Sequence, residues 1–332
     1  MLLILIIVSC TVGCNGNEQE VVEYGTKEKS STEQALEMVN YHKNDEPVQR
    51  NTTVAVIDTK YDLSEIEDGS LWVNTKEIPN NGIDDDKNGY VDDVNGWNFV
   101  EKSNEIHSDQ LCSHGTMMLN ALDDYGLEIM PISVLDDEGE GTTNSIIEAI
   151  QYAETNGADI CNLSIATYEE NKELGKVIHQ SSMLFIVAAG NTGEELNHEN
   201  KCYPACYKED NLITVAACAA DYNIIEESNF GKDYVDLAAP GDAIGIKLVN
   251  GEEVVAEGTS YATALTTRIA ALIRNRVPFE YNKKNIKQLI LNTVTKKESL
   301  NGKVNSSGII NMKHAIEELE NAKIGKNDTG SP

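Results

Sequence analysis

Short apolar runs and longer amphipathic stretches alternate along most of this chain. The segments 53–59 and 185–191 each contain an uninterrupted apolar run. Runs of this length are typical of strands buried on both faces, as in a parallel sheet. The stretch from Ser260 to about Arg274 predicts a helix instead. Strand-like and helix-like segments that alternate in this way predict an α/β fold, with a mostly parallel central sheet and helices on both faces.

The two ends of the chain differ from this pattern. Residues 2–8 form an apolar run that is too short to span a bilayer as a stable helix, and its alternative interpretations are an export signal and a buried strand. From Gly16 to about Val48 the chain is charged and rich in turn-forming residues. The pattern therefore divides the chain into a signal segment (1–14), a polar tether (15–50), one α/β domain (51–319) and a flexible tail (320–332).

Acidic residues strongly outnumber basic ones. The chain has 55 Asp and Glu residues against 26 Lys and Arg residues, which gives a formal net charge of −29. This charge disfavours nucleic acid and anionic membrane surfaces as partners, because both repel an acidic protein. It agrees with an exported protein that binds cations.

The start of the predicted helix carries a candidate nucleophile. Gly258 and Thr259 are small, turn-forming residues that present Ser260 in the first turn. The backbone N–H of a residue there lies at the positive end of the helix dipole, where it stabilises a developing oxyanion. The alternative is an ordinary helix cap, because Gly-Thr-Ser also caps helices without a catalytic role.

Three other segments supply the partners that a nucleophilic serine needs. Asp58 lies at the end of a strand-like run, where open α/β sheets place their sites. His114 lies among small residues in Ser-His-Gly-Thr, and histidine is the usual general base near neutral pH. Asn191 follows the second apolar run, and its amide could donate a hydrogen bond to an oxyanion. The structural alternatives are a turn-capping aspartate, a histidine without a role, and a strand-ending Gly-Asn turn.

The chain order Asp58, His114, Asn191, Ser260 resembles that of the subtilisin-like serine peptidases, or subtilases. Further segments resemble the same family. They are the strand, glycine turn and helix from Met130 to Ala153, the substrate-binding strand Asp159–Ser164, the loop Leu237–Gly241 before the nucleophile, and the turn Gly308–Asn311 into the last helix. The resemblance covers about residues 52–319 and implies a subtilisin-like α/β fold.

The resemblance also implies an activity, that of a serine endopeptidase acting on peptide or protein substrates. Ser260 would be the nucleophile, His114 the general base and acid, and Asp58 the residue that orients the histidine. Asn191 and the Ser260 N–H would bind the oxyanion. The implied substrate-binding residues are Leu163, Ser164 and Ile165, which would pair with an extended peptide backbone, and Ala188, Ala189 and Gly190, which would line the pocket for the residue before the scissile bond.

The sequence departs from the family pattern beside three of these positions. Lys60 stands where a glycine is usual, Met117-Met118-Leu119-Asn120 replaces His-Val-Ala-Gly, and Tyr261-Ala262-Thr263-Ala264 lacks the usual methionine and proline. None of these changes removes a catalytic atom. They leave an alternative of another class, a catalytically inactive, calcium-stabilised surface protein that binds peptides in the same groove.

An acidic insertion between Asp58 and His114 has the spacing of a calcium loop. Its oxygen-bearing side chains fall at positions one, three, five and nine of an EF-hand-like loop, with Gly89 at the turn. Position twelve is Asn95, so the usual bidentate glutamate is absent or comes from elsewhere. Many subtilases resemble this segment, and we expect a structural calcium ion; the alternative is a solvated acidic turn. The expected ligands are Asp84, Asp86, Asn88, Tyr90 and Asp92.

The N-terminal apolar run ends in a sequence that suggests lipidation. Ile7-Val8-Ser9-Cys10 resembles a bacterial lipobox, and Cys14 is a second candidate because it would allow a longer apolar core. We therefore expect an exported protein with a lipid anchor on the outer face of a bacterial cell membrane. Outside the cytoplasm, Cys202 and Cys206 could also form a disulfide.

Overall fold

A nine-stranded sheet forms the centre of the molecule. The computed structural model describes residues 6–7, 32–41, 51–64, 66, 69–110, 113–122, 126–247, 253–277 and 282–328. The strand order is β12-β13-β9-β8-β7-β5-β2-β4-β3, and every neighbouring pair is parallel except β12 with β13. The strands are β2 (Thr52–Asp58), β3 (Trp97–Asn98), β4 (Leu127–Ser133), β5 (Ile160–Leu163), β7 (Leu184–Ala188), β8 (Leu212–Cys218), β9 (Leu237–Pro240), β12 (Thr295–Lys296) and β13 (Gly308–Ile309).

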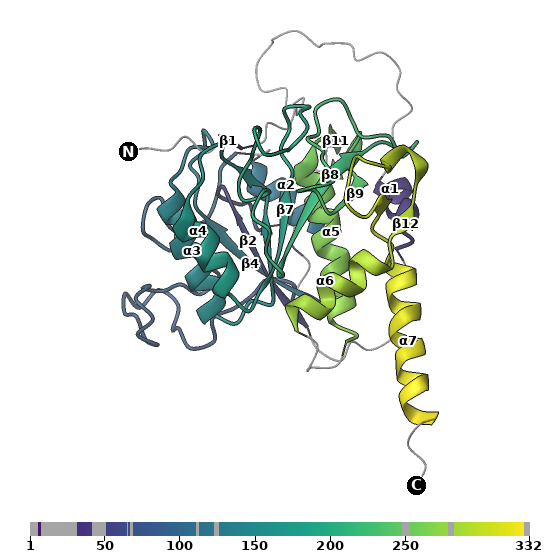
Figure 1. The fold of residues 1–332 in the computed structure, drawn as a ribbon. Coiled ribbons are helices and arrows are strands. Elements are labelled where there is room, and N and C mark those ends of the chain that lie inside the picture. Colours follow the sequence, from purple (N-terminus) through teal and green to yellow (C-terminus); the bar gives the residue numbers. More distant parts are fainter. Residues whose placement is uncertain are drawn as a thin grey trace.

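Helices cover both faces of this sheet (Figure 1). Side chains of β2 alternate between two cores: Val54 and Val56 pack on the side of α2 and α5, whereas Ala55 and Ile57 pack on the side of α3 and α4. This alternation explains why the run is apolar without interruption, and it confirms the predicted fold class. The helices are α1 (Thr32–Met38), α2 (His114–Leu122), α3 (Thr143–Thr155), α4 (Lys172–Gln180), α5 (Thr259–Arg274), α6 (Lys283–Asn292) and α7 (Met312–Asp328), with a 3-10 turn η1 (Glu298–Leu300).

The parallel strands bring their carboxyl ends to one edge of the sheet. β5 lies between β2 and β7 and pairs with both. Asp58 is the last residue of β2, Leu163 the last of β5, and Ala188 the last of β7. The segments that follow these three strands are therefore neighbours in space, although they are far apart in the sequence.

Two small antiparallel sheets accompany the central one. β10 (Ile244–Lys247) and β11 (Glu253–Ala256) form a hairpin. β6 (Ile165–Ala166), directly after the end of β5, pairs with β1 (Ile6–Ile7), with Ile6 opposite Ala166 and Ile7 opposite Ile165. The described part of the N-terminal apolar run is thus a strand. In the described part of the chain, no helix combines the length and the apolar character needed to cross a membrane.

Parts of the segments predicted as tether and tail are helical. Within the tether, α1 buries Ala35, and Val39 just beyond it is also buried and accepts a hydrogen bond of 3.0 Å from the Met312 N–H. Two apolar residues four positions apart lie on one side of a helical turn, so this short segment can dock on the domain. At the other end, α7 continues to Asp328, beyond the predicted boundary at Leu319. Helix-forming residues such as Ala322 and Lys323 favour this continuation past the last core residue.

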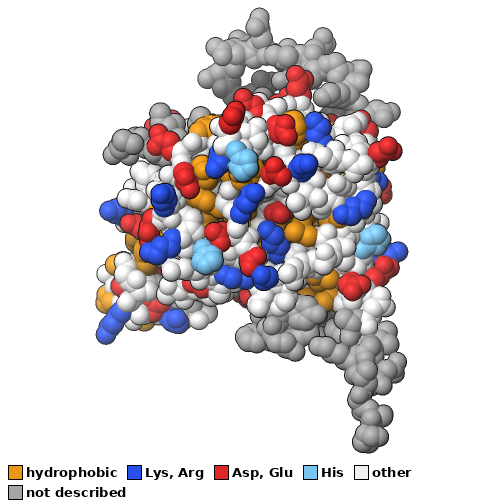
Figure 2. All heavy atoms as spheres, viewed as in Figure 1, with side chains coloured by type: hydrophobic (Ala, Val, Ile, Leu, Met, Phe, Trp, Pro, Cys, Tyr) orange, Lys and Arg blue, Asp and Glu red, His pale blue; other side chains and the backbone are white. Residues whose placement is uncertain are grey.

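Basic and acidic side chains are interspersed on the face of the molecule shown in Figure 2. Surface ion pairs of the described residues include Lys284 with Asp210 at 2.5 Å and Lys176 with Glu173 at 3.1 Å. The large negative net charge is therefore not gathered into one continuous patch on this face.

Candidate active site

A buried aspartate and a histidine form the centre of the site. Asp58 is fully buried, and its Oδ1 lies 2.7 Å from Nδ1 of His114, the first residue of α2. The Thr59 N–H donates to the same Asp58 oxygen at 2.8 Å, which orients the carboxylate. The Gly115 N–H donates to Thr59 Oγ1 at 2.9 Å and ties the start of α2 to the end of β2. A side chain at Gly115 would meet the Lys60 carbonyl oxygen at 2.8 Å, so the close approach requires glycine.

Ser260 lies in the first turn of α5, as predicted. Its side chain is buried, and its Oγ has no hydrogen-bond partner among the described residues. α5 packs against α2 near the start of each helix, where the Tyr261 hydroxyl donates to Met117 Sδ at 3.3 Å. Because His114 is the first residue of α2 and Ser260 the second of α5, this contact brings the candidate general base and the candidate nucleophile to the same region.

Asn191 is attached to the same helix start through its side chain. The Thr259 N–H and the Thr259 hydroxyl both donate to Asn191 Oδ1, at 3.0 and 2.7 Å. Gly258 has a φ of +129°, and a side chain there would lie 2.6 Å from Asn191 Nδ2. With Oδ1 occupied, Nδ2 is the end of the amide that can donate, and no acceptor for it is present in the described residues.

The expected substrate-binding residues lie at the ends of two neighbouring strands, β5 and β7, and in the segments that follow them. Leu163 ends β5 opposite Val187 of β7, and Ile165 begins β6. Ser164 lies between the strands, and its hydroxyl contacts Met118 Sδ of α2 at 3.6 Å. Ala188 ends β7, and Ala189 and Gly190 lead directly to Asn191; all six expected residues are buried. Both segments therefore begin at the carboxyl end of the sheet, where Asp58 also lies.

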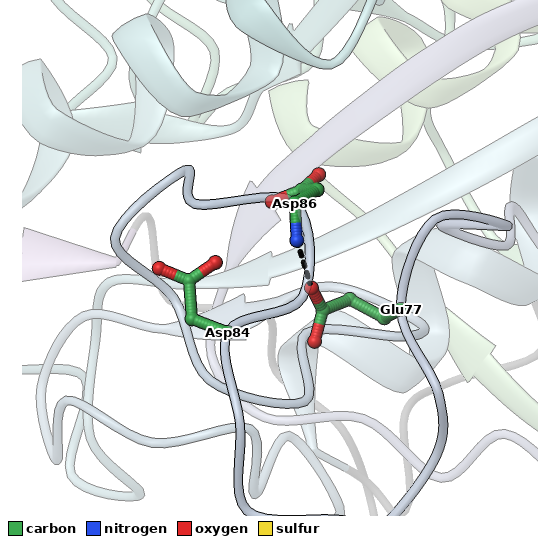
Figure 3. Close-up of side chains that lie close together, drawn as sticks. All are labelled: Glu77, Asp84 and Asp86. Atoms are coloured by element: carbon green, nitrogen blue, oxygen red, sulfur yellow. Dashed lines mark hydrogen bonds between the residues drawn. The ribbon is translucent and has the colours of Figure 1, made fainter.

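The acidic loop brings together carboxylates that are not all on the predicted list. Ligand oxygens of Glu77, Asp84 and Asp86 all lie within 4.8 Å of one another (Figure 3). Glu77 is buried, and its Oε1 accepts hydrogen bonds from the N–H groups of Asp85 and Asp86, at 2.9 and 3.1 Å. Glu77 is not among the predicted ligands because it lies before the loop, outside the EF-hand-like spacing. The one sequence feature that could have indicated this residue as a ligand is its acidic side chain in the segment just before the loop.

The other expected metal ligands lie around this trio. Asp92 does not belong to it: the Asp92 carboxylate accepts hydrogen bonds from the N–H groups of Asn81 and Gly82, at 3.0 and 2.9 Å. Asn88 Oδ1 accepts from the Tyr90 N–H at 2.8 Å. The Tyr90 ring packs edge-on against Trp97, with the ring centroids 5.1 Å apart, so it anchors the loop to the core.

A second buried carboxylate links the loop to α3. Asp93 accepts hydrogen bonds from the Tyr152 hydroxyl at 2.7 Å, from Asn74 Nδ2 at 2.9 Å and from Asn88 Nδ2 at 3.1 Å. Burial raises the pKa of Asp93 above its usual range, and these hydrogen bonds act in the opposite direction. The loop is therefore connected to the main core through Asp93 as well as through Tyr90.

The cysteines that the structure describes carry free thiols. Cys202 and Cys206 are both buried and are not joined by a disulfide, and Cys161 and Cys218 are buried in the core. Burial raises the pKa of Cys202 to about 12, so this thiol is neutral at ordinary pH. The expected lipidation sites, Cys10 and Cys14, lie outside the described residues.

Comparison with known proteins places the chain in a family. Residues 49–309 match the model of the subtilase family. This match covers most of the chain, and the protein belongs to the subtilase family. The chain order of Asp58, His114, Asn191 and Ser260, and their positions at strand ends and helix starts, agree with that membership.

Individual relatives are proteases of several kinds. The chain is 25% identical over 304 residues to subtilisin-like protease 1 of Plasmodium berghei, which covers 82% of the chain and 50% of that protein. It is 24% identical over 290 residues to a thermostable alkaline protease of Halalkalibacterium halodurans, which covers 80% of the chain and 76% of that protein. The chain thus spans about half the length of the Plasmodium relatives that it matches.

Solved structures share the fold. The epidermin leader peptide processing serine protease of Staphylococcus aureus superposes with a TM-score of 0.68 at 20% identity, over 86% of this chain and 80% of that one. A chain of the subtilase cytotoxin SubAB superposes with a TM-score of 0.64 at 21% identity, over 85% of this chain and 94% of that one. The central parallel sheet and its helical layers are therefore those of a subtilisin-like fold.

Proposed function

We propose that this protein is a serine endopeptidase in which Ser260 is the nucleophile, His114 the general base, and Asp58 the residue that orients the histidine. The observation that carries the proposal is the 2.7 Å contact between His114 Nδ1 and Asp58 Oδ1. With Nδ1 bonded to the carboxylate, Nε2 is the ring nitrogen that would take the proton of Ser260. Family membership and the proteases among the relatives support peptide-bond hydrolysis as the reaction.

The proposed reaction proceeds through an acyl-enzyme. Ser260 Oγ attacks the substrate carbonyl carbon while His114 takes its proton, and His114 then gives the proton to the leaving amine. Water enters in place of the amine, and the same histidine assists its attack on the ester. Asp58, which is fully buried, supports the imidazolium in both halves of the reaction.

Asn191 and the Ser260 N–H would hold the oxyanion of each tetrahedral intermediate. The Thr259 hydrogen bonds to Asn191 Oδ1 support this role, because they direct the donor end of the amide away from the Thr259 N–H. The N-terminal end of α5 adds the positive end of a helix dipole at the same place.

The substrate would bind as an added strand. The pairing of β6 with β1 supports this mode, because it demonstrates that β6 accepts an antiparallel strand along its edge. An extended substrate would use Leu163, Ser164 and Ile165 for backbone hydrogen bonds. Ala188, Ala189 and Gly190 would line the pocket beside the oxyanion donors.

The acidic loop would hold a structural calcium ion. Its donor set fits this hard cation, because Glu77, Asp84 and Asp86 offer carboxylate oxygens within 4.8 Å of one another. Three carboxylates at this spacing repel each other without a cation. Asn88 and Tyr90 lie beside the trio as further oxygen donors, and Asp92 would support the loop through its hydrogen bonds to the backbone. The ion would supply loop stability and no catalytic step.

The protein would act outside the cytoplasm. Its relatives include a minor extracellular protease and a cell wall-associated protease, both of Bacillus subtilis. Lipidation at Cys10 or Cys14 would attach it to the outer face of a bacterial membrane, and metabolic labelling with a clickable fatty acid in Cys10→Ala and Cys14→Ala variants tests this step.

A fluorophosphonate probe tests the central proposal. The probe acylates an activated serine, so the wild-type chain should be labelled on the peptide that contains Ser260, and Ser260→Ala should not. The same pair is assayed against a fluorogenic peptide library, where Ser260→Ala should lose cleavage by several orders of magnitude. Equal cleavage by both chains would overturn the assignment, and a folded wild-type chain without labelling would support the inactive, peptide-binding alternative.

A further inference from the structure

The turn that carries Asn191 is wrapped around one buried side chain. Asn229, in the loop after β8, is completely buried, and it hydrogen-bonds residues on both sides of Asn191. Its Nδ2 donates to the Ala189 carbonyl at 3.0 Å, and its backbone N–H donates to the Gly190 carbonyl at 2.8 Å. Its Oδ1 accepts from the Thr192 N–H, the Thr192 hydroxyl and the Glu194 N–H, at 3.2, 2.8 and 3.0 Å.

These contacts fix the backbone before and after Asn191 and leave its side chain to other partners. Gly190 has a φ of +101°, and a side chain there would lie 2.5 Å from Asn229 Nδ2. The backbone of the turn therefore lies so close to Asn229 that only glycine fits at position 190. Asn229 is itself held on the main sheet, because the Ser228 hydroxyl donates to the Asn229 carbonyl at 2.9 Å and accepts from the Ala217 N–H of β8, also at 2.9 Å.

We propose that Asn229 is a positioning residue for the oxyanion donor, acting through the backbone of the Ala189–Glu194 turn. The inference rests on the proposed function of Asn191. Thr259 orients the side-chain amide of Asn191, whereas Asn229 fixes the position of the backbone from which that side chain extends. Thr259 holds the Asn191 side chain and Asn229 holds the backbone around it. Neither contact uses the Nδ2 hydrogen atoms of Asn191, which stay available to the oxyanion. Preorganised donors of this kind stabilise a developing oxyanion because they need no rearrangement during the reaction.

A second buried asparagine provides a matched control. Asn211 is also buried, and its Nδ2 donates to the carbonyls of Ile178, Ser181 and Met183, at 2.7, 3.4 and 3.1 Å. It anchors the connection between α4 and the amino-terminal end of β7, at the opposite edge of the sheet from Asn191. Asn211→Ala and Asn229→Ala therefore remove similar buried amides, but only Asn229→Ala removes hydrogen bonds to the Ala189–Glu194 turn that carries Asn191.

The test measures kcat and KM for the full chain and its variants with a fluorogenic peptide that the wild-type chain cleaves. Asn229→Ala should lower kcat by about 10- to 100-fold, because small displacements of a catalytic group have effects of this size. KM should change little, and Asn211→Ala should lower the melting temperature while kcat stays within about twofold. In an Asn191→Ala background, Asn229→Ala should lower kcat by less than about twofold, because the donor that it positions is already absent.

Several outcomes would overturn the inference. They are an unchanged kcat in Asn229→Ala, an equal loss in Asn211→Ala, and a full Asn229→Ala loss that persists in the Asn191→Ala background. If Asn229→Ala does not melt cooperatively, Thr192→Ala replaces it, because Thr192 is exposed and this variant removes the 2.8 Å hydrogen bond from its hydroxyl to Asn229, together with a longer one of 3.4 Å to Glu194. Its kcat should fall in the wild-type background and not in the Asn191→Ala background, and an unchanged kcat would reject the inference.

The same measurements separate this inference from the proposed function. If Ser260→Ala cleaves as well as the wild-type chain, the endopeptidase assignment fails and the inference fails with it. If Ser260→Ala and Asn191→Ala both lose activity while Asn229→Ala keeps it, the assignment stands and only the positioning role is rejected.

Discussion

Thr259 donates two hydrogen bonds to one oxygen of Asn191, from its backbone N–H at 3.0 Å and from its hydroxyl at 2.7 Å. The residue before the proposed nucleophile therefore controls the orientation of the proposed oxyanion donor. The start of α5 and the end of β7 are joined by this contact, so the nucleophile and the donor keep a fixed relationship.

Removal of the Thr259 hydroxyl should loosen the orientation of the Asn191 amide. We expect Thr259→Val to lower kcat by about tenfold with little change in KM, because a lost hydrogen bond of about 1.4 kcal/mol corresponds to that factor. Thr259→Ser keeps the hydroxyl and should retain most of the activity. Steady-state kinetics of the two variants decide this: a loss in Thr259→Ser with full activity in Thr259→Val would mean that the threonine methyl group, and not the hydroxyl, matters.

Asp58→Asn tests the orientation of the histidine. The substitution keeps the size of the side chain but removes the charge that supports the imidazolium, and we expect kcat to fall by about 10⁴-fold. Asp62→Asn is the matched control, since the Asp62 side chain accepts a hydrogen bond from the nearby Ser64 N–H at 3.0 Å and has no contact with His114 in the described structure. Similar kinetics for wild type and Asp58→Asn would contradict the proposed role.

Calcium should stabilise the fold through the Glu77, Asp84 and Asp86 trio. An ion that binds only the folded loop adds about 2.7 kcal/mol at a hundredfold excess over Kd, so chelation should lower the melting temperature by roughly 5–10 °C. Glu77→Gln should reduce this difference, because it removes one of the three charges. Calorimetry with and without chelator measures the effect.

The control for the calcium experiment is Glu318→Gln, which removes an exposed carboxylate from α7. This variant should keep the full chelator sensitivity. Chelator sensitivity that survives in Glu77→Gln combined with Asp86→Asn would show that the relevant ion binds elsewhere.

Cys202 should resist alkylation in the folded protein. Burial raises its pKa to about 12 and raises the pKa of Cys206 as well, so the thiolate fraction at pH 8 is very small and rises only as the pH approaches the raised pKa. Iodoacetamide should therefore label both residues only after unfolding, as read by mass spectrometry. Rapid labelling of the folded chain would contradict the burial, and no labelling of the unfolded chain until a reductant is added would reveal a disulfide.

The departures from the family pattern become understandable in the structure. Met117 and Tyr261 each belong to a segment in which the sequence departs from the family pattern, and the two segments are far apart in the chain. In the fold they face each other, with the Tyr261 hydroxyl 3.3 Å from Met117 Sδ. The contact joins α2 to α5 close to the first residues of both helices.

The sequence by itself determined the elements that carry the proposed chemistry. Asp58 at a strand end, Ser260 at a helix start and Asn191 after a buried strand follow from local apolar periodicity and turn-forming residues, which depend on neighbouring positions only. Tertiary structure alone decided that Glu77 lies beside Asp84 and Asp86, and that Asn229 supports the Ala189–Glu194 turn. It also decided that residues 32–41 dock on the domain. Each of these contacts joins segments that are separated in the chain and meet only through the packing of loops around the sheet. A buried polar side chain takes whichever partners that packing supplies, and local sequence carries little information about them.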